Sequence, residues 1–333
     1  MVQCDSYNIN PPMLLKVLLV MAILVPNFCW DPLVGTNPSA EVQALFTRLA
    51  NYNRKFILSG QTDNYYNELK AKVGKSPLVR AYDMQNYSPH NPWFNWQPYD
   101  DGTVQNAINW YSSTGGKGIV SFHWHWFSPM GGNLRTSTFY TNYTDFDVSR
   151  AVIANTAEFN ATLQNIDAIA VQLKRLQAAK IPVMWRPLHE AGGKWFWWGA
   201  KTSADCKKLY EILFERINNH HGINNLLWLW STPEPDWYPG KNRVDIIGYD
   251  SYPGNFNYDC NIKMFMQLHD IVSGSKMVMM SENGPIPDIN SCFSSGALWG
   301  YFLSWADLVV QQNDDNHLRA VFSDSRVKTI ENA

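Results

Sequence analysis

Short apolar runs alternate with amphipathic segments along the chain from about residue 40 onward. Each run is bounded by polar, Gly or Pro positions, a pattern that predicts a buried β-strand rather than a helix. The eight predicted strands are Phe56–Ser59, Leu78–Tyr82, Gly118–His123, Pro182–Arg186, Leu226–Trp230, Asp245–Tyr249, Lys276–Met280 and Tyr301–Trp305. Between several of these runs the apolar positions repeat with helical spacing, most clearly over Leu163–Ala179, Ala204–Asn219 and Ile262–Val272.

Strands separated by helices indicate βαβ units and a parallel sheet. Eight such strands in a chain of 333 residues favour a closed (β/α)₈ TIM barrel, a fold of about 250 residues, over an open doubly wound sheet. No G-x-G-x-x-G sequence opens a helix, which argues against a dinucleotide-binding fold. No linker, repeat or low-complexity tract divides the chain, so we predict a single α/β domain over residues 31–333.

The first thirty residues have the character of a signal peptide. Leu14–Val25 is apolar apart from Lys16, and Pro26 ends the run, which makes it shorter than a membrane span of about 20 residues. A start at Met13 would give a more regular signal, and a buried N-terminal helix is the alternative. We expect residues 1–30 to be removed and the protein to be secreted, with no membrane attachment in the mature form.

Three cysteines remain after that removal, and an odd number permits one disulfide and one free thiol. Cys260 and Cys292 both lie in irregular segments, so we expect a bond between them, whereas Cys206 lies in a predicted helix as a lone buried thiol. Three triplets fit the acceptor sequence for N-glycosylation, in agreement with secretion. They begin at Asn86, Asn142 and Asn160.

The charge balance is close to neutral, with a formal net charge of -2 and no run of Lys or Arg. This excludes the electrostatic signature of a nucleic-acid-binding protein or an anionic-membrane binder and favours a neutral partner. The chain also contains 15 Trp, several of them in loops, such as Trp93, Trp96 and Trp237. Aromatic faces in loops suit the CH-rich face of a sugar ring. We expect a monomer.

The polar residues that follow the predicted strands are the candidates for chemistry, because a barrel of this kind places its active site at the carboxyl ends of the strands. They are Gln61, Asp83, His123, His189, Glu190, Ser231, Asp250, Tyr252, Glu282 and Trp305. Glu190 follows the fourth strand and Glu282 the seventh, and each leads into a Gly-containing turn. Two converging carboxyl groups are what glycosidic bond hydrolysis requires, one as acid and one as nucleophile or base.

Three segments around these residues resemble glycoside hydrolase family 26, the β-mannanases of clan A. The Trp185–Gly199 segment, WRPLHEAGGKWFWWG, is similar to the acid/base region, and Gly248–Tyr252 and Ser281–Gly284 are similar to the strand-6 and nucleophile regions. Leu318–Asp324 resembles the closing helix. The resemblance implies a (β/α)₈ barrel and a retaining mechanism through a covalent glycosyl-enzyme. Glu190 would be the general acid/base and Glu282 the nucleophile, about 5–5.5 Å apart.

The resemblance also implies six substrate-binding residues, namely His123, His189, Trp195, Asp250, Tyr252 and Trp305. Tyr252 would donate a hydrogen bond to the nucleophile, and Trp195 and Trp305 would form platforms beside the reacting sugar. From its place on the preceding strand, Arg186 is expected to support the carboxylates from below. Ala306 departs from the family, where an Arg can follow the strand-8 Trp and bind a more distant sugar.

The predicted function is secreted endo-1,4-β-mannanase acting on mannan, glucomannan or galactomannan. Alternatives are a β-1,3-xylanase or mixed-linkage β-glucanase of the same family, a carbohydrate-binding barrel without turnover, and a barrel oxidoreductase, for which no cofactor signature is present. His123 and His125 form an H-x-H pair, but the sequence shows none of the further ligands expected of a barrel metallohydrolase. We therefore predict no metal and no cofactor.

Overall fold

The computed structural model describes residues 30–92 and 100–333. Eight parallel strands close into a barrel in the order of the chain, which confirms the predicted TIM barrel. They are β2 (Gly60–Thr62), β3 (Val79–Asp83), β4 (Ile119–His123), β5 (Val183–Arg186), β6 (Leu226–Trp230), β7 (Ile246–Ser251), β8 (Met277–Asn283) and β9 (Phe302–Ser304). The predicted signal peptide, apart from Trp30, and the loop tryptophans Trp93 and Trp96 lie outside the described residues.

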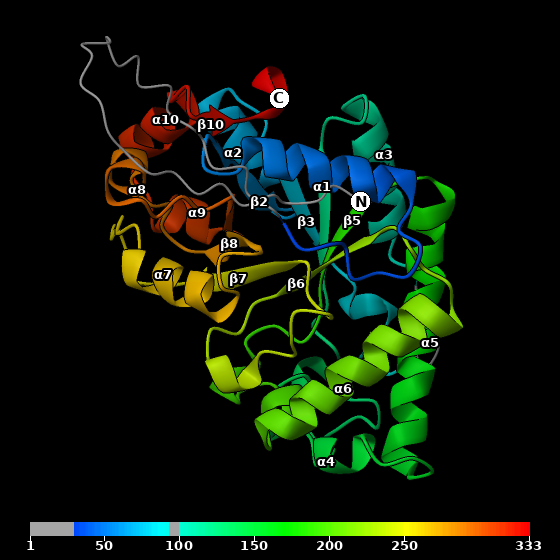
Figure 1. Ribbon diagram of the computed structural model, residues 1–333. Helices are drawn as coiled ribbons and strands as arrows, with labels where there is room; N and C mark the ends of the chain where they lie inside the picture. Colours follow the sequence, from blue (N-terminus) through cyan, green and yellow to red (C-terminus); the bar gives the residue numbers. More distant parts are fainter. Residues whose placement is uncertain (1–29, 93–99) are drawn as a thin grey trace, which may run out of the picture.

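Helices surround this barrel (Figure 1). They are α1 (Ala40–Tyr52), α2 (Tyr66–Val73), α3 (Thr103–Ser113), α4 (Val148–Ala151), α5 (Ala157–Ala178), α6 (Ser203–Glu215), α7 (Ile262–Ile271), α8 (Ile289–Ser295), α9 (Leu308–Gln311) and α10 (Asp315–Ser323). Their starts follow local rules: Thr156 caps α5 by accepting the backbone N–H of Phe159, and Thr202 and Asp205 form a capping box on α6. None of the helices in the described ranges has the length and apolar character needed to cross a membrane.

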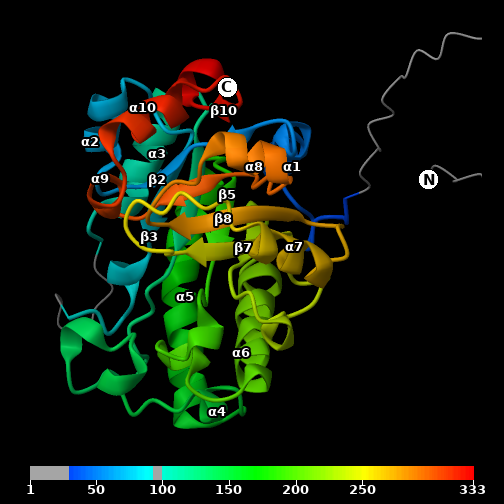
Figure 2. The same ribbon diagram turned by 90° about the vertical axis from the view of Figure 1, so that its left-hand side faces the viewer.

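The barrel interior follows the two-residue alternation of its strands. Apolar side chains fill its amino-terminal end, and α1 covers this end with Val42, Leu45 and Leu49 (Figure 2). The other face of each strand packs against the helices in a second apolar cluster that includes Trp185, Trp228 and Trp230. The amino-terminal end is therefore closed by packing, which leaves the carboxyl ends of the strands as the open side.

The first predicted strand was placed too early. Ile57–Leu58 forms β1, which pairs in parallel with β10 (Val327–Lys328) outside the barrel, and the barrel strand begins at Gly60. The reason is steric, because a Cβ at Gly60 would lie 2.6 Å from the carbonyl oxygen of Phe302 on the neighbouring barrel strand β9. Only glycine allows the chain to enter the barrel at this point.

The expected disulfide is wrong for this structure. Cys206, Cys260 and Cys292 are all free thiols, and all three are buried. The Cys260 Sγ lies 3.2 Å from the hydroxyl of Ser295 instead of being bonded to Cys292. A buried cysteine packs as a small apolar side chain and needs no bond. The expectation of a lone buried thiol at Cys206 is confirmed.

Candidate active site

The turn after β5 holds Glu190 in an uncommon backbone conformation. Glu190 has φ 54° and Leu188, two residues earlier, has φ 51°, both in the left-handed region that side chains other than glycine rarely adopt. The backbone N–H of Glu190 donates to the carbonyl oxygen of Ser231 on the adjacent β6 segment, at 3.2 Å. Strained residues of this kind concentrate at functional sites, where the surrounding structure imposes the conformation.

Trp195 lies over the same turn. Its indole Nε1–H donates to Glu190 Oε2 at 2.9 Å, while the residue remains 48% exposed. Gly193 makes this position possible, because a Cβ there would lie 1.9 Å from the indole ring. The predicted sugar platform is thus joined directly to the predicted acid, and half of it faces solvent, where a sugar ring could stack.

Glu282 owes its position to an irregularity in β8. Asp250 on β7 pairs with Glu282, whereas the preceding Tyr249 pairs with Met280, so that Ser281 is an extra residue in the strand. The bulge lets Ser281 and Glu282 both reach polar groups inside the barrel: Ser281 Oγ donates to Asp250 Oδ1 at 2.7 Å. Without the extra residue, the two-residue alternation would direct Glu282 toward the helices.

Two predicted side chains donate hydrogen bonds to Glu282. Tyr252 donates its hydroxyl hydrogen to Glu282 Oε1, and Arg186 donates from Nη2 to Glu282 Oε2. Arg186 also lies 2.6 Å from Asp250 Oδ2, through Nη1. Arg186 therefore lies beneath both carboxylates, as the sequence indicated, and holds Glu282 and Asp250 in fixed orientations.

Burial dominates the electrostatics of this group. It raises the pKa of Glu190, and the nearby Glu282 carboxylate raises it further, against the opposing influence of Arg186. Burial and the charge of Glu282 also raise the pKa of Asp250. Asp250 and Glu282 outweigh the effect of burial on Arg186 and raise the pKa of its guanidinium. The surroundings therefore raise the pKa of Glu190, next to an arginine that stays charged.

The two predicted catalytic carboxyl groups approach each other closely. One carboxylate oxygen of Glu190 and one of Glu282, together with one of Asp250, lie within 4.8 Å of one another. Glu282 is 5% exposed, so the pair is at the floor of an opening rather than on the surface. Retaining glycosidases separate their carboxyl groups by about 5–5.5 Å and inverting enzymes by about 6.5–9.5 Å.

Histidine and aromatic rings form the opposite wall of the site. His123 and His189 are 4% and 1% exposed, and Trp305 lies 5.2 Å from His123 between ring centroids. His125, which the sequence analysis noted only as half of an H-x-H pair, lies between them, 4.7 Å from His189 and 5.6 Å from Trp305. His125 was missed as a site residue, although the two-residue spacing at a strand end places both imidazoles on one side.

Asp83 at the end of β3 joins this wall. Its Oδ2 lies 2.7 Å from His125 Nδ1 and 3.5 Å from His123 Nε2. These residues line a polar cavity of about 450 Å³, together with Gln85, Asn86, Asp101 and Trp305. In the sequence alone, Asp83 is recognisable only as a polar residue at a strand end.

Trp197 and Trp198 pack beneath the Glu190 turn. Both are fully buried, and Trp198 Nε1–H donates to the carbonyl oxygen of His189 at 2.9 Å. Trp237, which the sequence suggested as a sugar contact, is buried as well, with 7% of its surface exposed. These tryptophans support the site from behind.

Three groups of acidic and histidine side chains in the described part of the chain bring potential metal ligands within 4.8 Å of one another. They are Asp83 with His123 and His125, Asp167 with His220 and His221, and Glu190 with Asp250 and Glu282. In each group a protein donor already occupies a carboxylate: His125 on Asp83, Arg216 on Asp167 and Arg186 on Glu282. No group needs a metal ion to satisfy its carboxylate.

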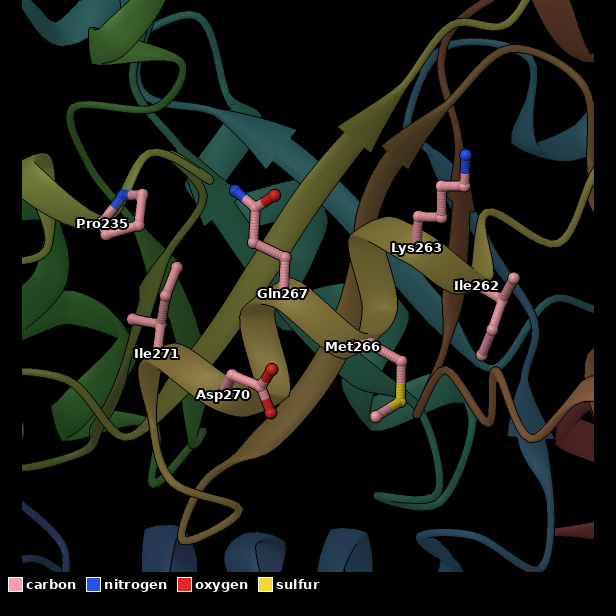
Figure 3. Close-up of a pocket in the computed structure, with 7 residues that line it drawn as sticks. All are labelled: Pro235, Ile262, Lys263, Met266, Gln267, Asp270 and Ile271. Atoms are coloured by element: carbon pink, nitrogen blue, oxygen red, sulfur yellow. The ribbon is translucent and has the colours of Figure 1, made fainter.

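A larger hollow, of about 700 Å³, lies on the outer surface of α7. Figure 3 shows that its side chains project from α7, apart from Pro235 on a separate loop. Its lining is mostly apolar and contains Asp270 as its one carboxylate. A shallow groove without convergent polar groups is a poor candidate for chemistry, so the candidate site is the barrel mouth.

Comparison with known proteins agrees with this placement. Residues 34–332 match the model of glycosyl hydrolase family 26. The chain belongs to glycosyl hydrolase family 26. The resemblance recognised in its Glu190 and Glu282 segments is therefore confirmed at the level of the family.

Several members of family 26 are similar to most of this chain. A mannan endo-1,4-β-mannosidase of Thermothelomyces thermophilus is 40% identical over 311 residues, which cover 89% of this chain and 62% of that protein. The crystal structure of the Podospora anserina GH26-CBM35 β-(1,4)-mannanase matches with a TM-score of 0.86 and 35% identity, and covers 92% of this chain and 70% of that one.

A third similar structure is the β-mannanase from a symbiotic protist of the termite Reticulitermes speratus, complexed with gluco-manno-oligosaccharide. Its TM-score is 0.81 at 31% identity, covering 91% of this chain and 98% of the other. The chain spans only 42–62% of the length of the first curated relatives that it matches.

Proposed function

We propose that this family 26 protein is a retaining endo-1,4-β-mannanase, with Glu190 as general acid/base and Glu282 as nucleophile. The observation that carries the proposal is the approach of a Glu190 oxygen to within 4.8 Å of a Glu282 oxygen at the mouth of the barrel. This distance is closer to the separation of about 5–5.5 Å in retaining enzymes than to the about 6.5–9.5 Å of inverting enzymes. Direct attack by Glu282 on the anomeric carbon follows.

The surroundings of the two residues suit these roles. Glu190 must be protonated to donate to the leaving oxygen, and burial raises the pKa of its carboxyl. Glu282 accepts hydrogen bonds from Arg186 and Tyr252, which fix the carboxylate in one orientation for attack. After the first step, Glu190 removes a proton from water as the glycosyl-enzyme is hydrolysed.

The remaining predicted residues surround the reacting sugar in this proposal. Trp195 and Trp305 provide aromatic faces, and His123 and His189 provide ring nitrogens on the opposite wall. Asp250, which is held by Arg186 and Ser281, acts at the base of the site. The mannan specificity rests on the relatives, since the family 26 proteins described above carry the name of β-mannanase.

Secretion and glycosylation form part of the same proposal. The side chains of Asn142 and Asn160 lie at exposed positions, whereas Asn86 is half-buried and donates to Asp101 at 2.8 Å. We expect glycan on Asn142 and Asn160 and none on Asn86, because an acceptor side chain must be accessible. Expression in a eukaryotic secreting host, N-terminal sequencing and glycopeptide analysis test the cleavage near residue 30 and the occupancy of each site.

The decisive experiment is hydrolysis of mannohexaose by the wild type, by Glu190→Ala and by Glu282→Ala, with product anomers followed by NMR. Internal cleavage with β-anomer formed first is expected for the wild type. Loss of the general acid is expected to reduce kcat about 10²- to 10⁴-fold. Glu68→Ala is the matched control, since Glu68 is exposed on α2 and does not line the polar cavity of the site.

Each other outcome points to a different error in the proposal. Initial α-anomer would contradict the retaining mechanism. Cleavage of β-1,3-xylan or mixed-linkage β-glucan in place of mannan would contradict the substrate. Retention on mannan in affinity electrophoresis without any product would indicate a carbohydrate-binding barrel.

A further inference from the structure

Asp83 uses both oxygens of its carboxylate to hold the end of β4. Oδ1 accepts the backbone N–H groups of Gln85 at 2.9 Å and of His125 at 3.0 Å. Oδ2 lies 2.7 Å from Nδ1 of the His125 ring and 3.5 Å from Nε2 of His123. The charges of the two histidines outweigh burial and hold the pKa of Asp83 well below its usual range. An ionised carboxylate accepts hydrogen bonds and cannot donate them.

This arrangement determines the tautomer of His125. Against the effect of burial, Asp83 raises the pKa of His125. Because this partner at 2.7 Å only accepts, Nδ1 carries a hydrogen in the protonated ring and keeps it in the neutral ring, which fixes the neutral tautomer. His125 lines the polar cavity, and its Nε2 makes no hydrogen bond to the residues that the structure describes. Asp83 therefore decides both the angle of the ring and which nitrogen faces the cavity.

The orientation of His125 matters to its neighbours because the wall is held by ring packing. His189 lies 4.7 Å from His125 between centroids and is 1% exposed. Within the described ranges, Nδ1 of His189 is buried without a hydrogen-bond partner, so no polar contact at that atom restrains the ring. Its further ring contacts are Phe196 at 5.0 Å, Trp198 at 5.5 Å and His123 at 6.0 Å. Rotation of His125 would therefore displace His189, which directly precedes Glu190 in the chain.

We infer that Asp83 is a positioning residue for catalysis: it holds His125 in one tautomer and one orientation, and through His125 it holds the wall formed by His189 and Trp305. The inference rests on the proposed function, since it assigns these rings to the walls of the site where the sugar reacts. Asp83 itself touches neither the carboxylate pair nor the sugar in this assignment.

Asp83→Asn is the sharpest variant because it keeps the shape of the side chain. If Oδ1 of the new amide keeps the two backbone N–H groups, its NH₂ faces Nδ1 of His125 and requires the opposite tautomer, with the hydrogen on Nε2. Misplacement of groups around a reacting centre by about 1 Å can cost about 10²-fold in rate. We expect a loss of about 10- to 100-fold in kcat on mannohexaose with KM changed less than about threefold, because the wall adjoins the reacting sugar.

Two further measurements separate positioning from a general loss of structure. In ¹⁵N-detected NMR of the histidine rings, recorded over a pH series up to the alkaline range in which His125 is neutral, His125 should show Nδ1–H in the wild type and Nε2–H in Asp83→Asn, with the signal assigned from its absence in His125→Phe. The double variant that combines Asp83→Asn with His125→Phe should have the kcat of the more impaired single variant, because the effects of substituting residues that act as one unit are not additive. Asp167→Asn is the control: Asp167 on α5 also holds a histidine, with its Oδ1 2.6 Å from His221 Nε2, but it does not line the cavity, so the kcat of this variant should remain near that of the wild type.

The outcomes distinguish this inference from the proposed function. Wild-type kcat or an unchanged His125 tautomer in Asp83→Asn, with an active wild type, overturns the inference and leaves the function standing. Additive effects in the double variant also overturn it. A wild type that cleaves no β-glycan overturns the proposed function instead, and the NMR comparison still reports whether Asp83 controls the ring.

Discussion

The two ends of the barrel interior are built from the same strands but from opposite kinds of side chain. The apolar end consists of Met184, Leu227, Leu229, Ile246 and Met277, each exposed by 1% or less and covered by α1. The charged end consists of Arg186, Glu190, Asp250 and Glu282. On β5 the change occurs between Met184 and Arg186, two residues apart and therefore on the same face of the strand.

This difference separates stability from chemistry within one fold. The apolar end gains free energy from the removal of hydrocarbon surface from water. The charged end must bury an arginine and three carboxyl groups, which is favourable only while each charge keeps its partner. Truncation of a side chain at the apolar end should therefore lower stability without changing the catalytic rate. Single substitutions at the charged end should reduce activity or stability.

The largest expected effect is on the rate, from Glu282→Ala at the charged end. Removal of the proposed nucleophile would abolish the proposed covalent route, so kcat on mannohexaose should fall by at least about 10⁴-fold. Reducing-sugar release under steady-state conditions measures this loss. A fall of less than about tenfold would show that another group performs the attack.

Arg186→Met should produce the largest loss of stability. It leaves Asp250 and Glu282 buried without their cation, so the free energy of unfolding should fall by about 3–5 kcal/mol at neutral pH. The deficit should shrink as the pH falls, because burial and the charge of Glu282 raise the pKa of Asp250, and its protonation removes one of the unpaired charges. Urea denaturation at several pH values measures it, and Arg175→Met, which breaks an exposed pair with Asp100, should change little.

Leu227→Ala tests the apolar end. The residue is fully buried in the cluster below the site, and its truncation should reduce the free energy of unfolding by about 2–5 kcal/mol. The kcat of the folded enzyme should stay at the wild-type value, since Leu227 touches none of the charged residues named above. A parallel loss of kcat would mean that the two ends are coupled rather than separate.

The smallest expected effect is a gain in thermal stability, from Glu190→Gln. Folding raises the pKa of Glu190 through burial and the Glu282 charge, and stability from such a group is lost as pH rises through its folded pKa. Glu190→Gln cannot ionise, so it should have the same Tm as the wild type in acid and a Tm higher by roughly 2 °C at neutral pH. Calorimetry across pH checks this. A lower Tm for the variant at neutral pH would contradict a buried, strained acid at this position.

Much of the site could be predicted because its residues belong to local segments. Glu190 follows an apolar strand and precedes a glycine-rich turn, and both features are visible in the sequence. Arg186 was correctly placed beneath the carboxylates from its position on the strand before the acid. The strand boundaries were less accurate. The predicted seventh strand, Lys276–Met280, ended at Met280, whereas the corresponding strand β8 continues through the bulge to Asn283.

Asp83 and His125 form a contact that local sequence patterns do not reveal. They are 42 residues apart in sequence, yet their side chains meet at 2.7 Å. The H-x-H spacing indicated that His123 and His125 share a side, but no local pattern shows which carboxylate faces them. That information depends on the register between β3 and β4, in which Asp83 pairs with His123.

By itself, the sequence determined the alternation of strands and helices, the barrel, the family and the two glutamates, because each depends on periodicity or on a contiguous motif. The tertiary structure decided what depends on packing between segments. It placed Gly60 rather than Phe56 at the start of the barrel, left Cys260 and Cys292 as free thiols, and used a bulge to direct Glu282 inward. Steric contact and strand register act between residues far apart in the chain, so no single segment of sequence contains them.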